Sequence, residues 1–144
     1  MPNVSVVIPT YNRPQFLKGA IDTAVSQTYA DIEIVVVDDG SNTEYATEIV
    51  SQYSDDVRRI THDENRGLSA ARNTGIADGD GKYIAFLDDD DRWHKNKLAK
   101  QVNALKATPE AGLATCRLAS INSNGNLLRC DEGVVDGDIA DEIY

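Results

Sequence analysis

Short apolar segments, each ending at polar or acidic residues, constrain the fold of this chain more than any other feature. Residues 4–8, 32–37 and 83–87 are rich in β-branched or aromatic side chains and do not alternate between apolar and polar. Such runs are typical of strands buried on both faces, as in parallel sheets covered by helices. They therefore predict an α/β fold.

Helical spacing of apolar residues fills the segments between these runs. Pro14 suits the first turn of a helix, and apolar residues recur at helical spacing from Phe16 to Val25. Further helices are predicted over residues 44–53, 67–77 and 95–107. Strands are also predicted over residues 57–61 and 113–121, with a turn at residues 124–125 and a hairpin partner at residues 127–129. The alternation predicts one domain over residues 1–144, a mostly parallel sheet flanked by helices.

The charge of the chain limits its partners. The formal net charge is −10, from 24 acidic and 14 basic residues, which argues against sequence-independent binding to nucleic acid. An anionic ligand would need a divalent cation to bridge the charges. No apolar run is long enough to span a bilayer, and no signal peptide is visible. We therefore expect a cytoplasmic location, with peripheral attachment to the inner face of the membrane left open.

Three polar segments follow predicted strands directly. They are residues 9–13, 38–41 and 88–91. In open parallel sheets, ligands bind beyond the carboxyl ends of the strands. The three segments are therefore expected to form one ligand site.

Four consecutive aspartates, Asp88 to Asp91, form the most distinctive of these segments. Adjacent carboxylates repel one another, and a bound cation would relieve that repulsion. Magnesium and manganese prefer oxygen ligands, and the phosphates of a ligand would complete the shell. The alternative is a solvated acidic turn that caps the next helix.

The other polar segments also have two interpretations each. Asp38 and Asp39 could bind metal, a ribose hydroxyl or a base, or could simply form a tight turn with Gly40 and Ser41. Tyr11 could stack on a base or serve as an ordinary core or surface aromatic residue.

Two arginines, Arg66 and Arg72, lie near the start of a predicted helix. This is a natural environment for a diphosphate. The alternative is that both belong to a solvated helix face.

Taken together, four motifs resemble those of family 2 glycosyltransferases. They are Val-Ile-Pro-Thr-Tyr-Asn-Arg, Val-Val-Asp-Asp-Gly-Ser, Asn-Arg-Gly-Leu-Ser-Ala-Ala-Arg-Asn and Phe-Leu-Asp-Asp-Asp-Asp, in this order. The resemblance extends from about Val4 to Leu118. It implies a GT-A fold, which is Rossmann-like, and a nucleotide-diphosphate sugar as the donor, often a UDP-sugar.

The resemblance also implies roles for individual residues. Asp39 would accept a hydrogen bond from the base, with Asp38 supporting the turn. Asp88 and Asp90 would form the family's DxD pair, with Asp90 as the direct ligand of Mn²⁺ or Mg²⁺. The full set expected to bind the nucleotide is Pro9, Thr10, Tyr11, Arg13, Asp38, Asp39, Arg72, Asp88 and Asp89.

The implied activity is inverting, metal-dependent transfer of a sugar to an acceptor hydroxyl, on a glycan or a lipid-linked acceptor. The family's catalytic base lies in a later segment, expected beyond Tyr144, so no residue is assigned as the base and the acceptor-binding part is expected to be absent. The alternative is a non-catalytic nucleotide-sugar-binding domain or a truncated fragment. A dinucleotide-binding domain is disfavoured because no glycine-rich fingerprint follows the first strand.

Overall fold

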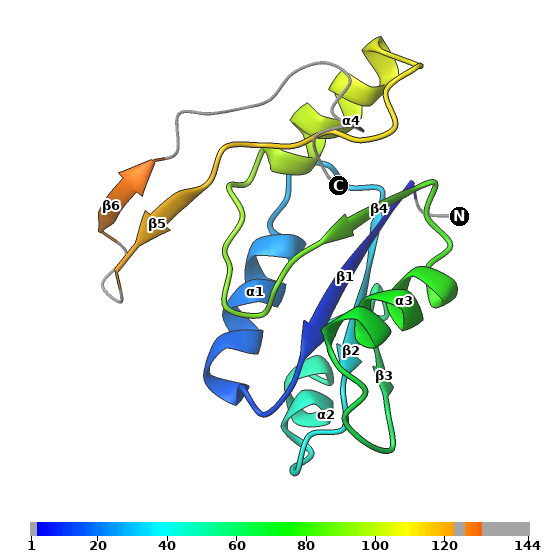
Figure 1. The fold of residues 1–144 in the computed structure, drawn as a ribbon, viewed down its shortest axis with the longest axis vertical. Coiled ribbons are helices and arrows are strands. Elements are labelled where there is room, and N and C mark those ends of the chain that lie inside the picture. The colour runs from blue at the N-terminus through cyan, green and yellow to red at the C-terminus, as the bar shows by residue number, and fades with distance from the viewer. Residues whose placement is uncertain (1–2, 123–125, 131–144) are drawn as a thin grey trace. The chain divides into compact units, whose positions relative to one another are not determined.

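A computed structural model describes residues 3–122 and 126–130 of the chain (Figure 1). The chain divides into two compact units, Met1–Leu98 and Ala99–Tyr144. The predicted turn at residues 124–125 and the C-terminal residues 131–144, which contain six acidic side chains, lie outside the described residues. The prediction of a single domain over residues 1–144 stays a prediction.

The first unit is built on a four-stranded parallel sheet. Its strands are β1 (Val4–Thr10), β2 (Ile32–Asp38), β3 (Val57–Thr61) and β4 (Tyr83–Phe86), in the order β3-β2-β1-β4. All four match predicted strands to within two residues at either end. The side chains of β1 are buried along its whole length, as the lack of alternation predicts.

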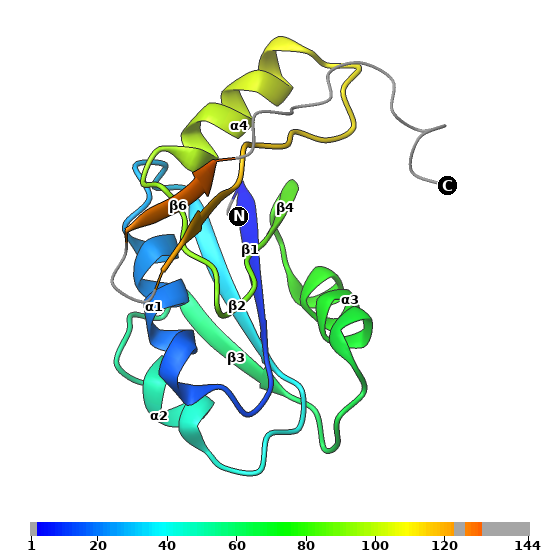
Figure 2. The same ribbon diagram turned by 60° about the vertical axis from the view of Figure 1, so that its left-hand side comes forward.

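Helices cover both faces of this sheet, as Figure 2 shows. Helices α1 (Pro14–Val25) and α2 (Tyr45–Val50) lie on one face, and α3 (Leu68–Asp78) lies on the other. Leu17 and Ile21 of α1 are fully buried, which accounts for the helical spacing of its apolar residues. The mostly parallel sheet flanked by helices is therefore confirmed.

Helix α3 packs directly against the sheet. Val7, Val35, Val37 and Ala71 form a buried cluster at this contact. Gly75 of α3 faces Val7, and a Cβ atom at position 75 would collide with the Val7 side chain. Glycine at this position therefore sets the distance between α3 and the sheet.

The second unit differs from the prediction in one segment. It contains most of α4 (Lys97–Ala107) and an antiparallel pair, β5 (Ala119–Ile121) with β6 (Leu127–Cys130). The hairpin is confirmed, but the prediction of strand over residues 113–118 is wrong. Leu113 and Leu118 are more than half exposed, and residues 113–118 pair with no described strand, so neither burial nor a backbone partner fixes this segment as a strand.

Within residues 3–122 and 126–130, no helix is long and apolar enough to cross a membrane. The cytoplasmic location and the peripheral attachment stay predictions.

Candidate functional site

The three predicted strand-end segments meet in one pocket of roughly 410 Å³ in the first unit. A fourth segment, at the start of α3, completes it. The residues that line the pocket are Pro9, Thr10, Tyr11, Arg13, Asp39, Asn65, Gly67, Leu68, Ala71, Asp88, Asp89 and Asp90. The segments after β1, β2 and β4 thus line one pocket, and that this pocket binds a ligand stays a prediction.

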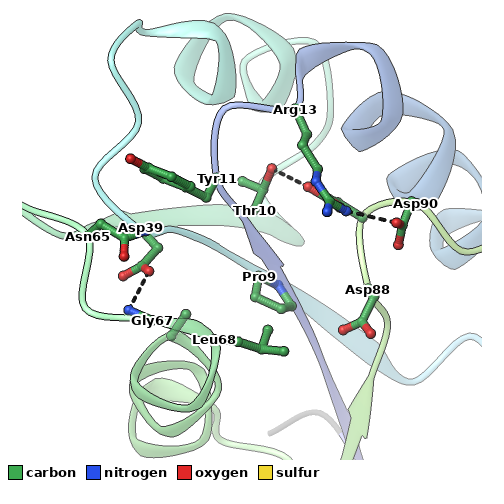
Figure 3. Close-up of a pocket in the computed structure, with 12 residues that line it drawn as sticks. Pro9, Thr10, Tyr11, Arg13, Asp39, Asn65, Gly67, Leu68, Asp88 and Asp90 are labelled. Carbon is green, nitrogen blue, oxygen red and sulfur yellow. Dashed lines mark hydrogen bonds and ion pairs between the residues drawn. The ribbon is translucent and has the colours of Figure 1, made fainter.

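The pocket has two chemically different ends, as Figure 3 shows. Tyr11, Asp39 and Asn65 lie together at one end, which we call the aromatic end. Asp88 and Asp90 lie at the other, which we call the acidic end. Pro9 and Leu68 lie between them, so a ligand in the pocket would meet apolar atoms along its middle.

At the aromatic end, Asp39 is held by three donors. The Arg66 amide donates to its Oδ1 (3.0 Å), the Gly67 amide to its Oδ2 (2.8 Å), and the His62 Nδ1 lies 2.7 Å from Oδ1. Burial alone would raise the pKa of Asp39, but the two amides and the imidazole outweigh it and lower the pKa. Asp39 is therefore an ionised carboxylate whose position is fixed by its own loop without a ligand.

Two glycines allow the loops at this end to meet. Gly67 has a φ of 89° at the start of α3, in the region where residues other than glycine are strained. Gly40 has a φ of 76°, and a Cβ atom there would collide with the backbone of Glu64. The Asp-Gly pair of the sequence is thus explained by the approach of the two loops, and the Arg-Gly pair by the positive φ at the start of α3.

At the acidic end, Asp89 points into the protein and belongs to a chain of hydrogen bonds. The Thr10 hydroxyl donates to its Oδ2 (2.7 Å) and lies 2.8 Å from the Tyr45 hydroxyl. Burial raises the pKa of Asp89, and the hydrogen bond from Thr10 and the charge of Arg13 only partly offset this. Asp89 therefore orients the acidic loop from behind, while still bordering the pocket.

The two flanking aspartates are more accessible, and each is paired with an arginine. Asp88 accepts from Arg72 (2.7 Å) and Asp90 from Arg13 (2.8 Å), with side-chain exposures of 42% and 47%. Arg13 also reaches Asp89 (3.3 Å), and the charges of Asp89 and Asp90 raise the pKa of Arg13. Arginines thus neutralise part of the repulsion between adjacent carboxylates.

The donor set at this end suits a hard divalent cation that also binds a ligand. Among the described residues, no group of three or more His, Cys, Asp or Glu side chains is arranged to hold a metal ion by itself. Magnesium usually takes one or two carboxylates and obtains its other ligands from phosphates and water. Asp88 and Asp90, which both line the pocket, fit that pattern.

The loop that follows the aspartates is fastened to α1. The Arg92 guanidinium donates to the carbonyl of Phe16, the Trp93 amide donates to the Thr23 hydroxyl (3.3 Å), and buried Gln27 donates to the carbonyl of His94. These bonds hold the acidic segment from its far side, so its position is set by α1 as well as by β4.

Two residues of the predicted nucleotide-binding set do not line the pocket. Asp38 is buried, and its Oδ1 accepts the Ser41 amide (3.0 Å), so it supports the turn. Arg72 reaches the pocket only through Asp88, and its Nε is buried without a hydrogen-bond partner. Pro9, Thr10, Tyr11, Arg13, Asp39, Asp88 and Asp89 do line it. Their contact with a nucleotide stays a prediction.

Sequence reasoning missed several residues at this site. Asn65, Gly67, Leu68 and Ala71 line the pocket, although only arginines were singled out in that segment. His62 was also missed. It directly follows β3 and so lies opposite Asp39, because β2 and β3 pair Asp38 with Thr61. Only the pairing of β2 with β3, which no local sequence pattern specifies, brings His62 beside Asp39.

Comparison with known proteins identifies the family. The family described as Glycosyl transferase family 2 matches residues 5–134 of the chain. This chain belongs to that family. The predicted resemblance is thereby confirmed, and so is the expectation of a glycosyltransferase fold.

Curated relatives are also glycosyltransferases by name. The Rickettsia prowazekii protein named uncharacterized glycosyltransferase RP339 is 38% identical over 130 residues, which cover 90% of this chain and 40% of that protein. Glycosyltransferase GlyA of Streptococcus pneumoniae is 46% identical over 123 residues, 84% of this chain and 17% of that protein. The chain spans between 15% and 46% of the length of such relatives.

Solved structures of glycosyltransferases share the fold. Staphylococcus aureus TarS 1–349 in complex with UDP-GlcNAc has a TM-score of 0.67 and 26% identity, over 74% of this chain and 32% of that one. The mannosyltransferase PcManGT of Pyrobaculum calidifontis, in complex with GDP-Man and Mn²⁺, has a TM-score of 0.65 and 28% identity, over 72% and 32%. These neighbours bind nucleotide sugars with two different bases.

Proposed function

We propose that this chain is the donor-binding part of an inverting glycosyltransferase that uses a UDP-sugar and a divalent cation, Mn²⁺ or Mg²⁺. The observation that carries the proposal is the two-ended pocket. An aromatic ring and a buried carboxylate lie at one end, and accessible carboxylates lie at the other.

Each end suits a different part of a nucleotide sugar. Tyr11 is 42% exposed and offers a face on which a base can stack. Asp39 is an acceptor for a base N–H. Leu68 and Pro9 would pack against the ribose between the two ends.

Asp88 and Asp90 would hold the cation at the acidic end, and Asp89 would keep their loop in place. When bound, the cation would neutralise charge that develops on the leaving diphosphate. Arg13 lies beside the same carboxylates and is itself half exposed, so its guanidinium can turn toward a phosphate.

The transfer step needs an acceptor hydroxyl and a base that removes its proton. We assign no described residue to that base. The acceptor, a glycan or a lipid-linked molecule, remains part of the proposal, as does the inverting outcome. The alternative, a non-catalytic nucleotide-sugar-binding domain, makes use of the same pocket.

The experiment is calorimetric titration of the chain with UDP, in Mn²⁺ and then in a chelator. We expect binding in Mn²⁺ and much weaker binding in the chelator. Equal affinity in both would rule out the metal bridge, and no binding of any nucleoside diphosphate would rule out the donor-site assignment. Release of UDP from UDP-sugars, with and without acceptors, then separates the enzyme from the binding domain.

A further inference from the structure

Asp39 lies in a buried network that the proposed donor site does not by itself explain. His62 is 7% exposed, and its two ring nitrogens contact different elements. Nδ1 lies 2.7 Å from Asp39 Oδ1, and Nε2 lies 2.8 Å from the hydroxyl of Thr74 in α3. The imidazole thus joins the end of β2 to α3 directly behind the aromatic end of the pocket.

The hydrogen bonds define which nitrogen carries the proton. An ionised carboxylate only accepts hydrogen bonds, so Nδ1 must donate to Asp39. In neutral His62 the Nε2 is then an acceptor, and the Thr74 hydroxyl donates to it. Thr74 does not line the pocket, so the order Asp-His-Thr positions Asp39 and does not activate a nucleophile.

The two oxygens of Asp39 are left unequal by this arrangement. Each carboxylate oxygen has about two acceptor positions. Among the described residues, Oδ1 uses both positions, for the Arg66 amide and for His62, whereas Oδ2 uses one, for the Gly67 amide. A single acceptor position, on Oδ2, remains for a ligand.

We propose that His62 is a positioning residue that determines base specificity. By filling the last acceptor position on Oδ1, it leaves Asp39 able to accept one hydrogen bond from a base, which favours uracil over guanine. This inference rests on the proposed donor site. Uracil presents one N–H, at N3, between two carbonyls. Guanine presents two adjacent donors, N1–H and the N2 amino group, which need both oxygens of a carboxylate. With Oδ1 occupied, one guanine donor would be buried without a partner, which is costly.

The inference bears on a choice that the fold leaves open, because the structural neighbours include complexes with UDP-GlcNAc and with GDP-Man. Cytosine is disfavoured for a different reason. Its N3 is an acceptor, which would face the acceptor Oδ2.

The test compares affinities for UDP and GDP, by calorimetry in Mn²⁺, across variants of the full chain. For the wild type we expect UDP to bind roughly tenfold or more tightly than GDP, the effect of one unpaired buried donor. His62→Leu should weaken UDP binding and bring the UDP to GDP ratio close to one, because Oδ1 regains a free acceptor position. His62→Asn, which can place an amide donor near the Nδ1 position, should restore most of the ratio.

The matched control is His94→Leu, which removes the other histidine of the chain, exposed and outside the pocket. It should leave the ratio unchanged. If His62→Leu does not fold, the comparison of His62→Asn and Thr74→Val with the wild type provides the same test, because Thr74→Val removes only the hydroxyl that orients the ring and should lower the ratio.

Two results would overturn the inference while leaving the proposed donor site intact. One is wild-type affinity for GDP equal to or greater than that for UDP. The other is a ratio in folded His62→Leu that stays within twofold of the wild-type ratio. Failure of the wild type to bind any nucleoside diphosphate would instead reject the donor site, and the inference with it.

Discussion

The carboxylates at the two ends of the pocket differ in their exposure to solvent and in the groups that hold them. At the aromatic end, the Asp39 side chain is 5% exposed and is held by backbone amides and a buried imidazole. At the acidic end, Asp88 and Asp90 are 42% and 47% exposed and are held by arginine side chains. Amides are fixed by the fold, whereas arginines on flexible stems can exchange partners. The aromatic end is therefore prebuilt for its ligand, and the acidic end is balanced by charges that a cation can replace.

The largest effect is expected from Asp90→Asn. Outer-shell partners of a metal ligand already change metal affinity about 10–100-fold, so loss of a direct ligand should cost at least about 100-fold. Manganese binding in the presence of UDP, followed by electron paramagnetic resonance, gives the measurement. Asp91→Asn is the matched control, because Asp91 is adjacent and acidic but does not line the pocket. Equal losses in both variants would mean that only the net charge matters.

Asp39→Asn should lower the stability of the folded chain even without a ligand, because it disturbs the aromatic end. The amide group of asparagine would face an N–H donor, and a buried unsatisfied group costs about 1–3 kcal/mol. The pKa of Asp39 is lower in the folded chain than in the unfolded one. Its stabilising contribution is therefore present above about pH 4 and is lost as the pH falls through the folded-state pKa.

Thermal denaturation at pH 7 and at pH 3 tests this prediction. We expect the melting temperature of Asp39→Asn to lie well below that of the wild type at pH 7, with the gap closing toward pH 3. A constant gap across that range would show that the ionised form of Asp39 is not what the loop requires.

Arg13→Gln should change Mn²⁺ affinity less than Asp90→Asn does, and should raise it instead of lowering it. Removing the guanidinium frees Asp90 from a half-exposed ion pair, which is worth at most about 1 kcal/mol. We expect nucleotide-free protein to bind Mn²⁺ about two- to fivefold more tightly. Lys18→Gln is the control, since Lys18 forms an exposed pair with Asp22 away from the pocket. Weaker Mn²⁺ binding in Arg13→Gln would show that Arg13 supports the cation site.

The smallest effect is expected from Asp89→Asn. Burial raises the pKa of Asp89, so ionisation of this side chain is less favourable in the folded chain than in the unfolded one. An asparagine can still accept the Thr10 hydroxyl bond without that charge. The melting temperature should stay within about 2 °C of the wild type or rise. A large fall at pH 7 would mean that the ion pair with Arg13 outweighs the cost of burial.

The comparison of the two ends also explains what the sequence could predict. The acidic end was predicted in detail, because Asp88 to Asp91 are consecutive in the chain and follow a recognisable strand. The aromatic end was predicted only in part. Asp39 and Tyr11 were singled out, but His62 and Asn65 were not. The positions of His62 and Asn65 depend on which strands are neighbours, and no local sequence pattern specifies the strand order.

The fold shows the same contrast between features that depend on a segment's own sequence and features that depend on its surroundings. The four strands of the parallel sheet were predicted to within two residues from their apolar runs, although only β1 and most of β2 are fully buried. The segment at residues 113–118 resembles a strand locally, yet its leucines are exposed and it pairs with no described strand. Apolar composition predicted burial there, and only the surroundings of a segment decide whether burial occurs.

The contact between Gly75 and Val7 is buried, so we expect substitutions there to change the shape of the pocket from a position that no ligand contacts. Helix α3 carries Leu68 of the pocket wall and Thr74 of the support behind Asp39, so moving α3 would move both. Selection for an altered donor in the laboratory should therefore return changes at position 75, accompanied by a smaller residue at position 7. Gly75→Ala paired with Val7→Ala would be such a suppressor pair, in which the second change restores room that the first removes. Chemists who design inhibitors against the pocket should expect resistance to arise from this hidden contact as well as from the residues that their compounds touch.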